Sequence, residues 1–280
     1  MPELPEVEII RRVLLPQIQG AVIQTVSVTR PEVVAHPDAD KFCRQLTGQK
    51  IHNMTRRGKF LTVLLVSGDS LSLHLRMTGC LLLVPPDNPM KKHTHVMFQL
   101  DNGKELRFSD PRRFGRFWLL ERDEADTYSG AGSLGVEPLE SSLTAAYLKT
   151  SFYRRKRPVK ECLLDQKSIA GIGNIYSDEI LFSAQVHPSR TANSLTDDEW
   201  KRLAEEIPKV LNYFIEKSAV TPEEFLQGTG QDYRNTAFLR VYGREGEPCP
   251  MCGTTLRKTV IAGRSSVFCP HCQPMNALSK

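Results

Sequence analysis

The chain opens with a helical pattern of apolar residues and continues with a strand-like one. From about Leu4 to Gln19, apolar positions recur at helical spacing between charged residues, which predicts an amphipathic helix. Pro5 suits its first turn, and Pro16 predicts a kink or an end. From Ala21 to Glu121 the period shifts towards two, which is typical of short strands. The strand candidates are Val22–Thr29, Ile51–Arg57, Phe60–Val66, Leu71–Leu75, His95–Leu100 and Leu106–Phe108.

Turn signals organise the rest of the chain. Asn102-Gly103 lies between two strand candidates and predicts a hairpin, because both residues tolerate positive φ. Several short strands joined by tight turns favour a β-sandwich or barrel. The glycine-rich stretch Ser129–Ser142 is interpreted as a linker. Beyond it the pattern becomes helical, as at Leu195–Glu216, and the polar segment Gly228–Arg240 is predicted to be a mobile loop.

Composition favours a globular protein of a reducing compartment. The 280 residues suffice for two domains, and 40% hydrophobic with 25% charged residues is a globular balance rather than a disordered one. The net charge of +5 is compatible with a polyanionic partner but weak as a signal alone. We expect no signal peptide and no membrane span, because no long apolar run occurs. Seven cysteines, an odd number without a framework, argue against a disulfide-built secreted fold.

Four of the cysteines form two closely spaced pairs near the end of the chain. Cys249 and Cys252 are followed, after sixteen residues, by Cys269 and Cys272. This spacing is a strong signal for a structural zinc site. Four thiolates complete a tetrahedral shell and leave no open position for a substrate or water. His271 could also bind the metal, but with four cysteines present a solvated histidine is the better interpretation.

The residues between the two cysteine pairs predict a hairpin. Leu256–Ile261 and Ser265–Phe268 have the pattern of two strands, joined at Ala262-Gly263-Arg264. Between Arg244 and Lys280 there are five Lys and Arg residues and only two acidic ones. A solvated charged face would explain this excess, but Arg264 near the turn favours a hairpin that grips phosphates.

The first residues after Met1 carry unusual chemistry. We expect removal of Met1, which would leave Pro2 with a free secondary amine. An α-amine titrates near pH ~8, so much of it is a neutral nucleophile at physiological pH. A secondary amine that attacks an aldehyde-like carbon forms an iminium ion, and Glu3 beside it is a candidate proton carrier. By position alone, however, a frayed chain end is the simpler interpretation.

Several segments in order resemble bacterial formamidopyrimidine-DNA glycosylases, which excise oxidised purines. The opening Pro-Glu-Leu-Pro-Glu-Val-Glu resembles this branch more than the endonuclease VIII branch, which typically begins Pro-Glu-Gly-Pro-Glu. The match extends from residue 2 to about residue 273. The segments that carry it are Pro2–Glu8, Arg56–Leu61, His74–Gly79, Asp110–Gly115, Gly171–Tyr176 and the four-cysteine finger with Gly263-Arg264.

The resemblance implies an α+β fold of two domains with DNA in the cleft between them. An N-terminal β-sandwich with flanking helices would span residues 1–130, followed by an interdomain linker at 131–145. A helical DNA-binding domain with a helix-two-turn-helix motif would span 146–240, and a zinc-bound β-hairpin 241–280. It further implies one structural Zn²⁺ ion and double-stranded DNA with damaged bases or abasic sites as the partner. We expect a cytoplasmic, bacterial-type monomer with no membrane association.

The resemblance also assigns roles in base excision repair. The enzyme would be a glycosylase and abasic-site lyase that cleaves the strand by β,δ-elimination through a Pro2 Schiff base. Its catalytic residues map to Pro2, Glu3, Lys59 and Arg264, with Glu6 in support. A helix that starts at Pro5 would turn its positive end towards Pro2 and favour the neutral amine. The DNA-binding positions map to His74, Met77, His93, Arg112, Phe114, Asn174, Tyr242 and Lys258.

Three of these residues would fill the space of the flipped-out nucleotide, namely Met77, Arg112 and Phe114. Arg112 and Phe114 are two residues apart, so in an extended segment they would point the same way. Arg113 and Arg116 lie close by, and the sequence leaves open which arginine intercalates.

Further basic and polar residues are expected along the DNA. Asn174 is predicted to cap a helix over Ile175–Ala184, whose N-terminus would suit a phosphate. Arg154–Arg157 with Lys160 form the densest basic run, which we interpret as general electrostatic attraction.

The segment Lys217–Glu224 departs from the family pattern. A glycine pair is missing, Pro222 stiffens the turn, and Glu223 stands where a basic residue is common. The choice between 8-oxoguanine, formamidopyrimidines and oxidised pyrimidines therefore stays open. An endonuclease VIII-like enzyme for oxidised pyrimidines is one alternative. A non-catalytic zinc-ribbon DNA-binding protein is another, since it needs the finger but not Pro2 and Glu3.

Overall fold

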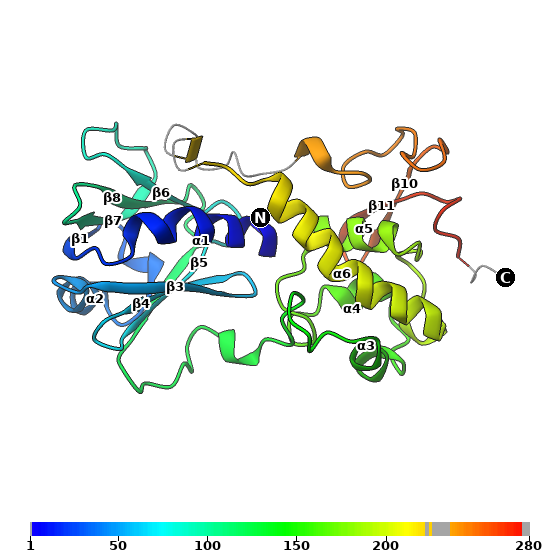
Figure 1. Cartoon of the computed structure of the whole chain (residues 1–280), viewed down its shortest axis with the longest axis horizontal. Coiled ribbons are helices and arrows are strands. Elements are labelled where there is room, and N and C mark those ends of the chain that lie inside the picture. The colour runs from blue at the N-terminus through cyan, green and yellow to red at the C-terminus, as the bar shows by residue number, and fades with distance from the viewer. Residues whose placement is uncertain (1, 222–223, 226–235, 276–280) are drawn as a thin grey trace. The chain divides into compact units, whose positions relative to one another are not determined.

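The computed structural model describes residues 2–221, 224–225 and 236–275 (Figure 1). These residues form two compact units, which are described separately. The first consists of residues 2–133, 218–221 and 224–225, and the second of 134–217 and 236–275. No helix in the described ranges is long and apolar enough to cross a membrane.

The first unit is a sandwich of two sheets. One sheet has the strand order β1-β7-β8-β6, and the other β2-β9-β5-β4-β3. Phe117 of β9 contacts Phe98 of β7 and Phe108 of β8, with ring centroids 6.1 and 5.1 Å apart, so the core lies between the sheets. The strands are β1 Ile23–Val28, β2 Val34–His36, β3 Ile51–Arg57, β4 Phe60–Leu65, β5 Ser70–His74, β6 Cys80–Val84, β7 Thr94–Leu100, β8 Glu105–Ser109 and β9 Arg116–Leu120.

Helices flank the sandwich. Helix α1 (Leu4–Ile18) packs against β3 and β4, and Pro16 remains inside its last turn. Helix α2 (Ala39–Leu46) is capped by Asp38, whose carboxylate accepts the Lys41 N–H at 2.8 Å. The short 3₁₀ turns of the unit are η1 Pro31–Val33 and η2 Ala131–Ser133.

The second unit is helical and ends in a hairpin. Helix α6 (Asp197–Lys217) contacts both α3 (Ala145–Phe152) and α5 (Asn174–Ser183). Helix α5 in turn contacts α4 (Val159–Leu163) and the hairpin strand β11. The remaining elements are β10 Arg257–Ile261, β11 Arg264–Phe268, η3 Ala192–Ser194 and η4 Thr236–Phe238. The predicted combination of β-sandwich, helical region and terminal hairpin is confirmed.

The expected linker is tied to the second unit rather than extended. The Gly135 N–H donates to the Gln166 carbonyl at 2.8 Å, and Val136 forms an isolated bridge with Ile169. A Cβ at Gly135 would lie 2.1 Å from the Ser168 carbonyl oxygen, so only glycine allows this approach. The exact domain boundaries stay a prediction.

Candidate functional site

The start of the chain is held in place by helix capping. Glu3 is the N-cap residue of α1, and its N–H donates to a Glu6 carboxylate oxygen at 2.7 Å. The Glu3 carboxylate accepts the Glu6 N–H in return, which completes a capping box. Pro2, Glu3 and Glu6 are buried, so the chain is packed from Pro2 onwards. Pro2 therefore lies at the positive end of α1.

Glu8 joins this helix to the strand that leads to Lys59. Burial raises the pKa of the Glu8 carboxyl, but hydrogen bonds from Arg11 and Arg12 and the charges of Arg11 and Arg56 lower it to about 2. The Arg56 Nε donates to Glu8 at 3.2 Å, across from α1 to β3. The ionised Glu8 thus fixes α1 against β3 at its penultimate residue, close to the turn.

Lys59 and His74 come together through strand pairing. Gly58 and Lys59 form the two-residue turn between β3 and β4, which Gly58 permits with φ of 53°. Phe60 after this turn is paired with His74 at the end of β5. Both Lys59 and His74 are buried, although the resemblance assigns them to DNA.

His74 is a neutral hydrogen-bond donor. Its Nδ1 accepts the Arg76 N–H at 3.0 Å, which leaves Nε2 to carry the proton. Burial lowers the pKa of His74 to about 3, with repulsion by Arg76 and Lys59 as the next causes. An uncharged N–H donor of this kind can bind a phosphate oxygen at physiological pH without a change in protonation.

The three residues expected to fill the hole in DNA are exposed on two loops. Met77 is 41% exposed and Phe114 46%, which is unusual for such side chains. The Arg112 guanidinium lies 4.5 Å from the centre of the Phe114 ring. The two meet across a turn, with Arg113 at φ of 55°, and not along the extended segment that we expected. Arg113 instead pairs with Glu32 at 3.2 Å, which favours Arg112 as the intercalating residue.

Sequence reasoning missed Asp110, which organises these loops. Its side chain is fully buried and accepts the N–H groups of Arg112 (3.2 Å), Phe114 and Gly115 (both 2.8 Å). It also accepts the Thr78 hydroxyl. An Asp-Pro pair is typical of a turn in which the aspartate carboxylate accepts N–H groups of the residues that follow. This signal could have identified Asp110 from the sequence.

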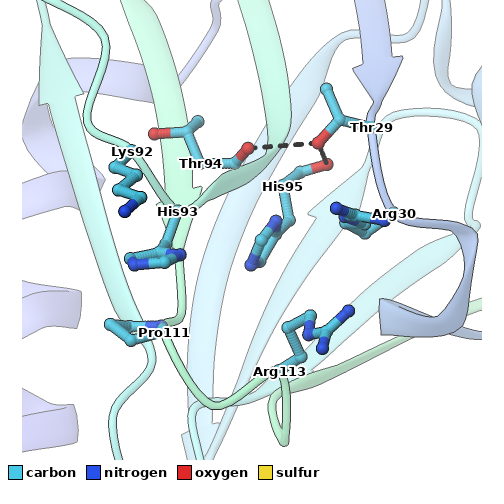
Figure 2. Close-up of a pocket in the computed structure, with 8 residues that line it drawn as sticks. All are labelled: Thr29, Arg30, Lys92, His93, Thr94, His95, Pro111 and Arg113. Atoms are coloured by element: carbon cyan, nitrogen blue, oxygen red, sulfur yellow. Dashed lines mark hydrogen bonds between the residues drawn. The ribbon is translucent and has the colours of Figure 1, made fainter.

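A basic pocket of about 410 Å³ adjoins the same loop (Figure 2). His93 and His95 flank the start of β7, and Figure 2 shows both rings beside the loop that carries Pro111 and Arg113. The His95 Nε2 lies 2.9 Å from the Asp110 carbonyl oxygen, which links the pocket to that loop. None of the lining residues is acidic, so the pocket suits an anion. They are Thr29, Arg30, Lys92, His93, Thr94, His95, Pro111 and Arg113.

Helix α5 positions the polar residues of the second unit. Gly173 is the N-cap, and Asn174 is the first helical residue, so the expectation that Asn174 caps the helix is wrong. Within the described part of the chain, Asn174 Oδ1 is buried and has no hydrogen-bond partner. Glu179 of α5 is fully buried and accepts the N–H groups of Val241 and Tyr242 at 2.9 Å each. These bonds hold the backbone of Tyr242 against the helix.

The densest basic run has a structural role in part. Lys160 is fully buried and donates to Asp178 at 2.7 Å and to the Ser265 carbonyl at 2.9 Å. Arg155 and Arg157 both pair with Asp165, at 2.8 and 3.0 Å. The expectation that this whole run serves general attraction is therefore wrong for Lys160, whose charge is neutralised by buried Asp178, while Arg155 and Arg157 are half-buried in ion pairs with Asp165.

The hairpin tip presents Arg264. Ala262 and Gly263 have φ of 48° and 73°, as a type I′ turn requires. Arg264 is not a turn residue as expected but the first residue of β11, paired with Ile261, and it is exposed. Lys258 on β10 is also accessible and pairs with Glu245 at 2.6 Å.

Four cysteines converge beneath the hairpin. The sulfur atoms of Cys249, Cys252, Cys269 and Cys272 all lie within 4.8 Å of one another, and two of the separations are 3.9 and 3.5 Å. A tetrahedral Zn²⁺ with Zn–S bonds near 2.3 Å requires sulfur separations of about 3.8 Å, so the cluster fits zinc. Buried side chains around it form a core shared with α5, consisting of Phe182, Val241, Leu256 and Val267 together with Cys249 and Cys269.

The segment that departs from the family pattern contains a capping box of its own. The Thr221 N–H donates to Glu224 at 2.7 Å, and the Glu224 N–H to the Thr221 hydroxyl at 3.2 Å. The missing glycine pair is thus replaced by a helix-start signal. The expectations for Pro222 and Glu223 lie outside the described residues, as does most of the loop expected at Gly228–Arg240.

Comparison with known proteins is consistent across the chain. Residues 1–117 match the formamidopyrimidine-DNA glycosylase N-terminal domain, 134–224 its H2TH domain, and 246–274 a zinc finger found in FPG and IleRS. A formamidopyrimidine-DNA glycosylase of Pelotomaculum thermopropionicum is 45% identical over 98% of this chain and 99% of its own length. That of Bacillus cereus is 43% identical over the same shares.

Solved structures agree with these relatives. A mutant of the Lactococcus lactis FPG in complex with a Fapy-dG containing DNA superposes with a TM-score of 0.89 at 33% identity, covering 98% of this chain and all of that one. The Lactococcus lactis Fpg with an abasic site containing DNA gives a TM-score of 0.88 at 32% identity, covering 97% of this chain and 99% of that one. The complex of the Lactococcus lactis enzyme with an oxidized pyrimidine containing DNA gives a TM-score of 0.88 at 33% identity. This match covers 98% of this chain and 100% of that one.

The sandwich, the helical unit and the cysteine-bound hairpin define a DNA glycosylase of base excision repair with a zinc finger. The chain belongs to the formamidopyrimidine-DNA glycosylase family. The resemblance seen in the sequence is thereby confirmed.

Proposed function

We propose that this glycosylase is also an abasic-site lyase that works through a Schiff base on Pro2. The observation that carries this proposal is the burial of Pro2 at the positive end of α1, directly before the capping box of Glu3 and Glu6. A nucleophilic amine must be ordered and uncharged, and both conditions are favoured there. The Lactococcus lactis complex with abasic-site DNA is in keeping with such a substrate.

The proposed reaction starts with attack of the Pro2 nitrogen on C1′ of the damaged nucleotide. The bond between C1′ and the base breaks, and the base leaves with the electron pair and takes up a proton. The nitrogen loses its proton, and opening of the C1′–O4′ bond, with a proton delivered to O4′, then gives the iminium ion. Loss of a C2′ proton then expels the 3′ phosphate, and a second elimination expels the 5′ phosphate. Glu3 moves the protons, and Lys59 stabilises negative charge.

DNA is held by phosphate contacts while the nucleotide is flipped out. His74, Asn174, Tyr242, Lys258 and Arg264 grip the backbone, and His93 adds a contact at the basic pocket. Met77, Arg112 and Phe114 fill the vacated space, with the Arg112 fork bonding the orphaned base. One structural Zn²⁺ holds the hairpin that presents Lys258 and Arg264. The enzyme acts as a monomer.

The proposed substrates are oxidised purines, namely formamidopyrimidines and 8-oxoguanine. The Fapy-dG complex of the Lactococcus lactis enzyme is in keeping with this choice. Oxidised pyrimidines are the second candidate, because a complex of the same enzyme contains an oxidised pyrimidine. Single-turnover rates on duplexes with 8-oxoguanine, formamidopyrimidine, 5-hydroxycytosine or an abasic site decide between them. Equal or faster release of the oxidised pyrimidine would overturn the purine assignment.

Borohydride trapping tests the mechanism. Reduction should join the protein covalently to abasic DNA, because borohydride converts the iminium to a stable amine. Pro2→Gly should lose most of this product, and an N-terminal tag should abolish it. Pro16→Ala, on the same helix but away from its start, is the matched control and should trap like wild type. No trapping by the wild-type protein would overturn the Schiff-base mechanism and the lyase activity.

A further inference from the structure

Two separate loops carry the side chains proposed to fill the hole in DNA. Met77 lies in the loop after β5, and Arg112 and Phe114 lie in the loop after β8. Exposed side chains on independent loops would be ordered only when DNA binds, at a cost in conformational entropy. The loops are not independent, however, because one buried carboxylate binds both.

That carboxylate belongs to Asp110. One of its oxygens accepts the Thr78 hydroxyl and the Arg112 N–H, and the other accepts the N–H groups of Phe114 and Gly115. Thr78 directly follows Met77, so each loop is bonded next to the residue that it presents. Hydrogen bonds to an ionised acceptor are about twice as strong as neutral ones.

The position of Asp110 is fixed from the side of the sheet. Its N–H donates to the His93 carbonyl at 2.9 Å, and its own carbonyl lies 2.9 Å from the His95 Nε2. A Cβ at Gly115 would lie 2.4 Å from the Phe108 ring, so only glycine brings that N–H to the carboxylate. The anchor is therefore rigid, and the loops bend around it.

We propose that Asp110 is a positioning residue that makes Met77, Arg112 and Phe114 enter the DNA as one preformed unit. This inference deepens the proposed function and rests on its assignment of these three side chains. Asp110 itself touches neither the DNA nor the reacting atoms. It acts by holding the backbone of both loops before DNA binds.

Insertion can be measured without chemistry. The probe is a duplex with a tetrahydrofuran abasic analogue opposite cytosine. A 2-aminopurine lies beside that cytosine, and its fluorescence rises when its stacking is broken. Asp110→Asn should slow the rise by about tenfold, because in either orientation the amide NH₂ faces at least one backbone N–H that needs an acceptor, and the negative charge is lost. Thr78→Val should give a smaller loss, and Thr78→Ser should recover the wild-type rate. Asp101→Asn is the matched control, since Asp101 bonds the Val22 N–H on a distant turn.

A second measurement separates positioning from general damage. Borohydride trapping on single-stranded abasic DNA requires no hole to be filled, so Asp110→Asn should stay within about twofold of wild type. Equal insertion rates for wild type, Asp110→Asn and Thr78→Val would overturn the proposal, as would equal losses of Asp110→Asn in both measurements. If wild type fails to trap at all, the lyase proposal fails, and the insertion rates still decide the role of Asp110.

Discussion

Lys160 and Asp178 form an ion pair of 2.7 Å in which neither side chain is exposed. Asp178 also accepts the Ser266 hydroxyl at 2.7 Å and the Val267 N–H at 3.0 Å. Lys160 reaches the Ser265 carbonyl on the same strand. The pair therefore joins α4 and α5 to the hairpin strand β11, whose first residue is Arg264. A charge pair inside the unit thus sets the position of an exposed arginine.

Removal of one partner of this pair should be costly. Lys160→Met leaves Asp178 as a buried carboxylate without its counter-charge, and such losses typically amount to about 3–5 kcal/mol of unfolding free energy. Urea unfolding of the zinc-loaded protein measures the change. Lys209→Met is the control, because Lys209 pairs with Glu206 on an exposed face of α6 and should change little. Similar losses of unfolding free energy in the two variants would show that the buried pair stabilises the protein no more than an exposed pair does.

Glu179 should matter for DNA binding although it contacts no DNA in our proposal. In Glu179→Gln the amide oxygen can still accept the Val241 and Tyr242 N–H groups, but the NH₂ group replaces the oxygen that accepts the Arg240 N–H and Nε. We expect about tenfold weaker binding to a duplex with a tetrahydrofuran site, because the segment from Arg240 to Tyr242 loses its ion pair and one of its backbone anchors. Fluorescence anisotropy at fixed salt measures the affinity. Glu216→Gln, on the exposed face of α6, should bind like wild type, and equal affinities of all three proteins would refute the positioning role.

The sequence predicts local structure well where side chains alternate or where ligand spacing is strict. The expected strand His95–Leu100, in which Val96, Phe98 and Leu100 are buried, agrees with β7 to within one residue, and the cysteine cluster also agrees with the structure. Two missed strands, β6 and β9, are runs of mostly buried apolar residues without alternation, so the period carries no signal. The third, β2, has only three residues.

Sequence patterns do not show which residues of a charged run are buried and which are exposed. Lys160 and Arg154 belong to one basic stretch, yet Lys160 is fully buried beside a carboxylate eighteen residues further on. Asn174 was assigned as an N-cap because asparagine favours that position, but Gly173 adopts the extended conformation there. Asp110 is marked in the sequence only by its Asp-Pro turn signal, because most of its partners are backbone groups and the Thr78 hydroxyl lies on another loop.

The depressed pKa of His74 should make the protein sensitive to mild acid. An imidazole in the unfolded chain titrates near pH ~6.5, whereas burial lowers the pKa of His74 in the folded protein to about 3. Between these values only the unfolded chain binds the proton, so stability is complete above pH ~6.5 and is lost as the pH falls. For His74 alone we expect a loss of about 2 kcal/mol in unfolding free energy from pH 7.5 to pH 5.

Urea unfolding of wild type and His74→Gln at the two pH values isolates this effect. The pKa of Glu8 is lowered to about 2, so that carboxyl stays ionised across the window. Burial also lowers the pKa of His187, but this group is common to both proteins and cancels in the comparison. His74→Gln should therefore lose less stability than wild type between pH 7.5 and pH 5. Parallel losses would mean that His74 is protonated without penalty in the folded state.

Loss of zinc should remove DNA binding through the hairpin and disturb α5 as well. The finger shares its core with Phe182 of α5, so its collapse exposes apolar surface on a helix that also carries Asn174 and Glu179. We expect one zinc per chain in the native protein and less than one in Cys252→Ser, measured by atomic absorption. If Lys258 and Arg264 each contact a phosphate, the slope of log affinity against log salt should become shallower by about 2. Cys43→Ser, on α2 and outside the cluster, should keep both the zinc and the slope. An unchanged slope in zinc-free Cys252→Ser would contradict the assignment of phosphate contacts to the hairpin.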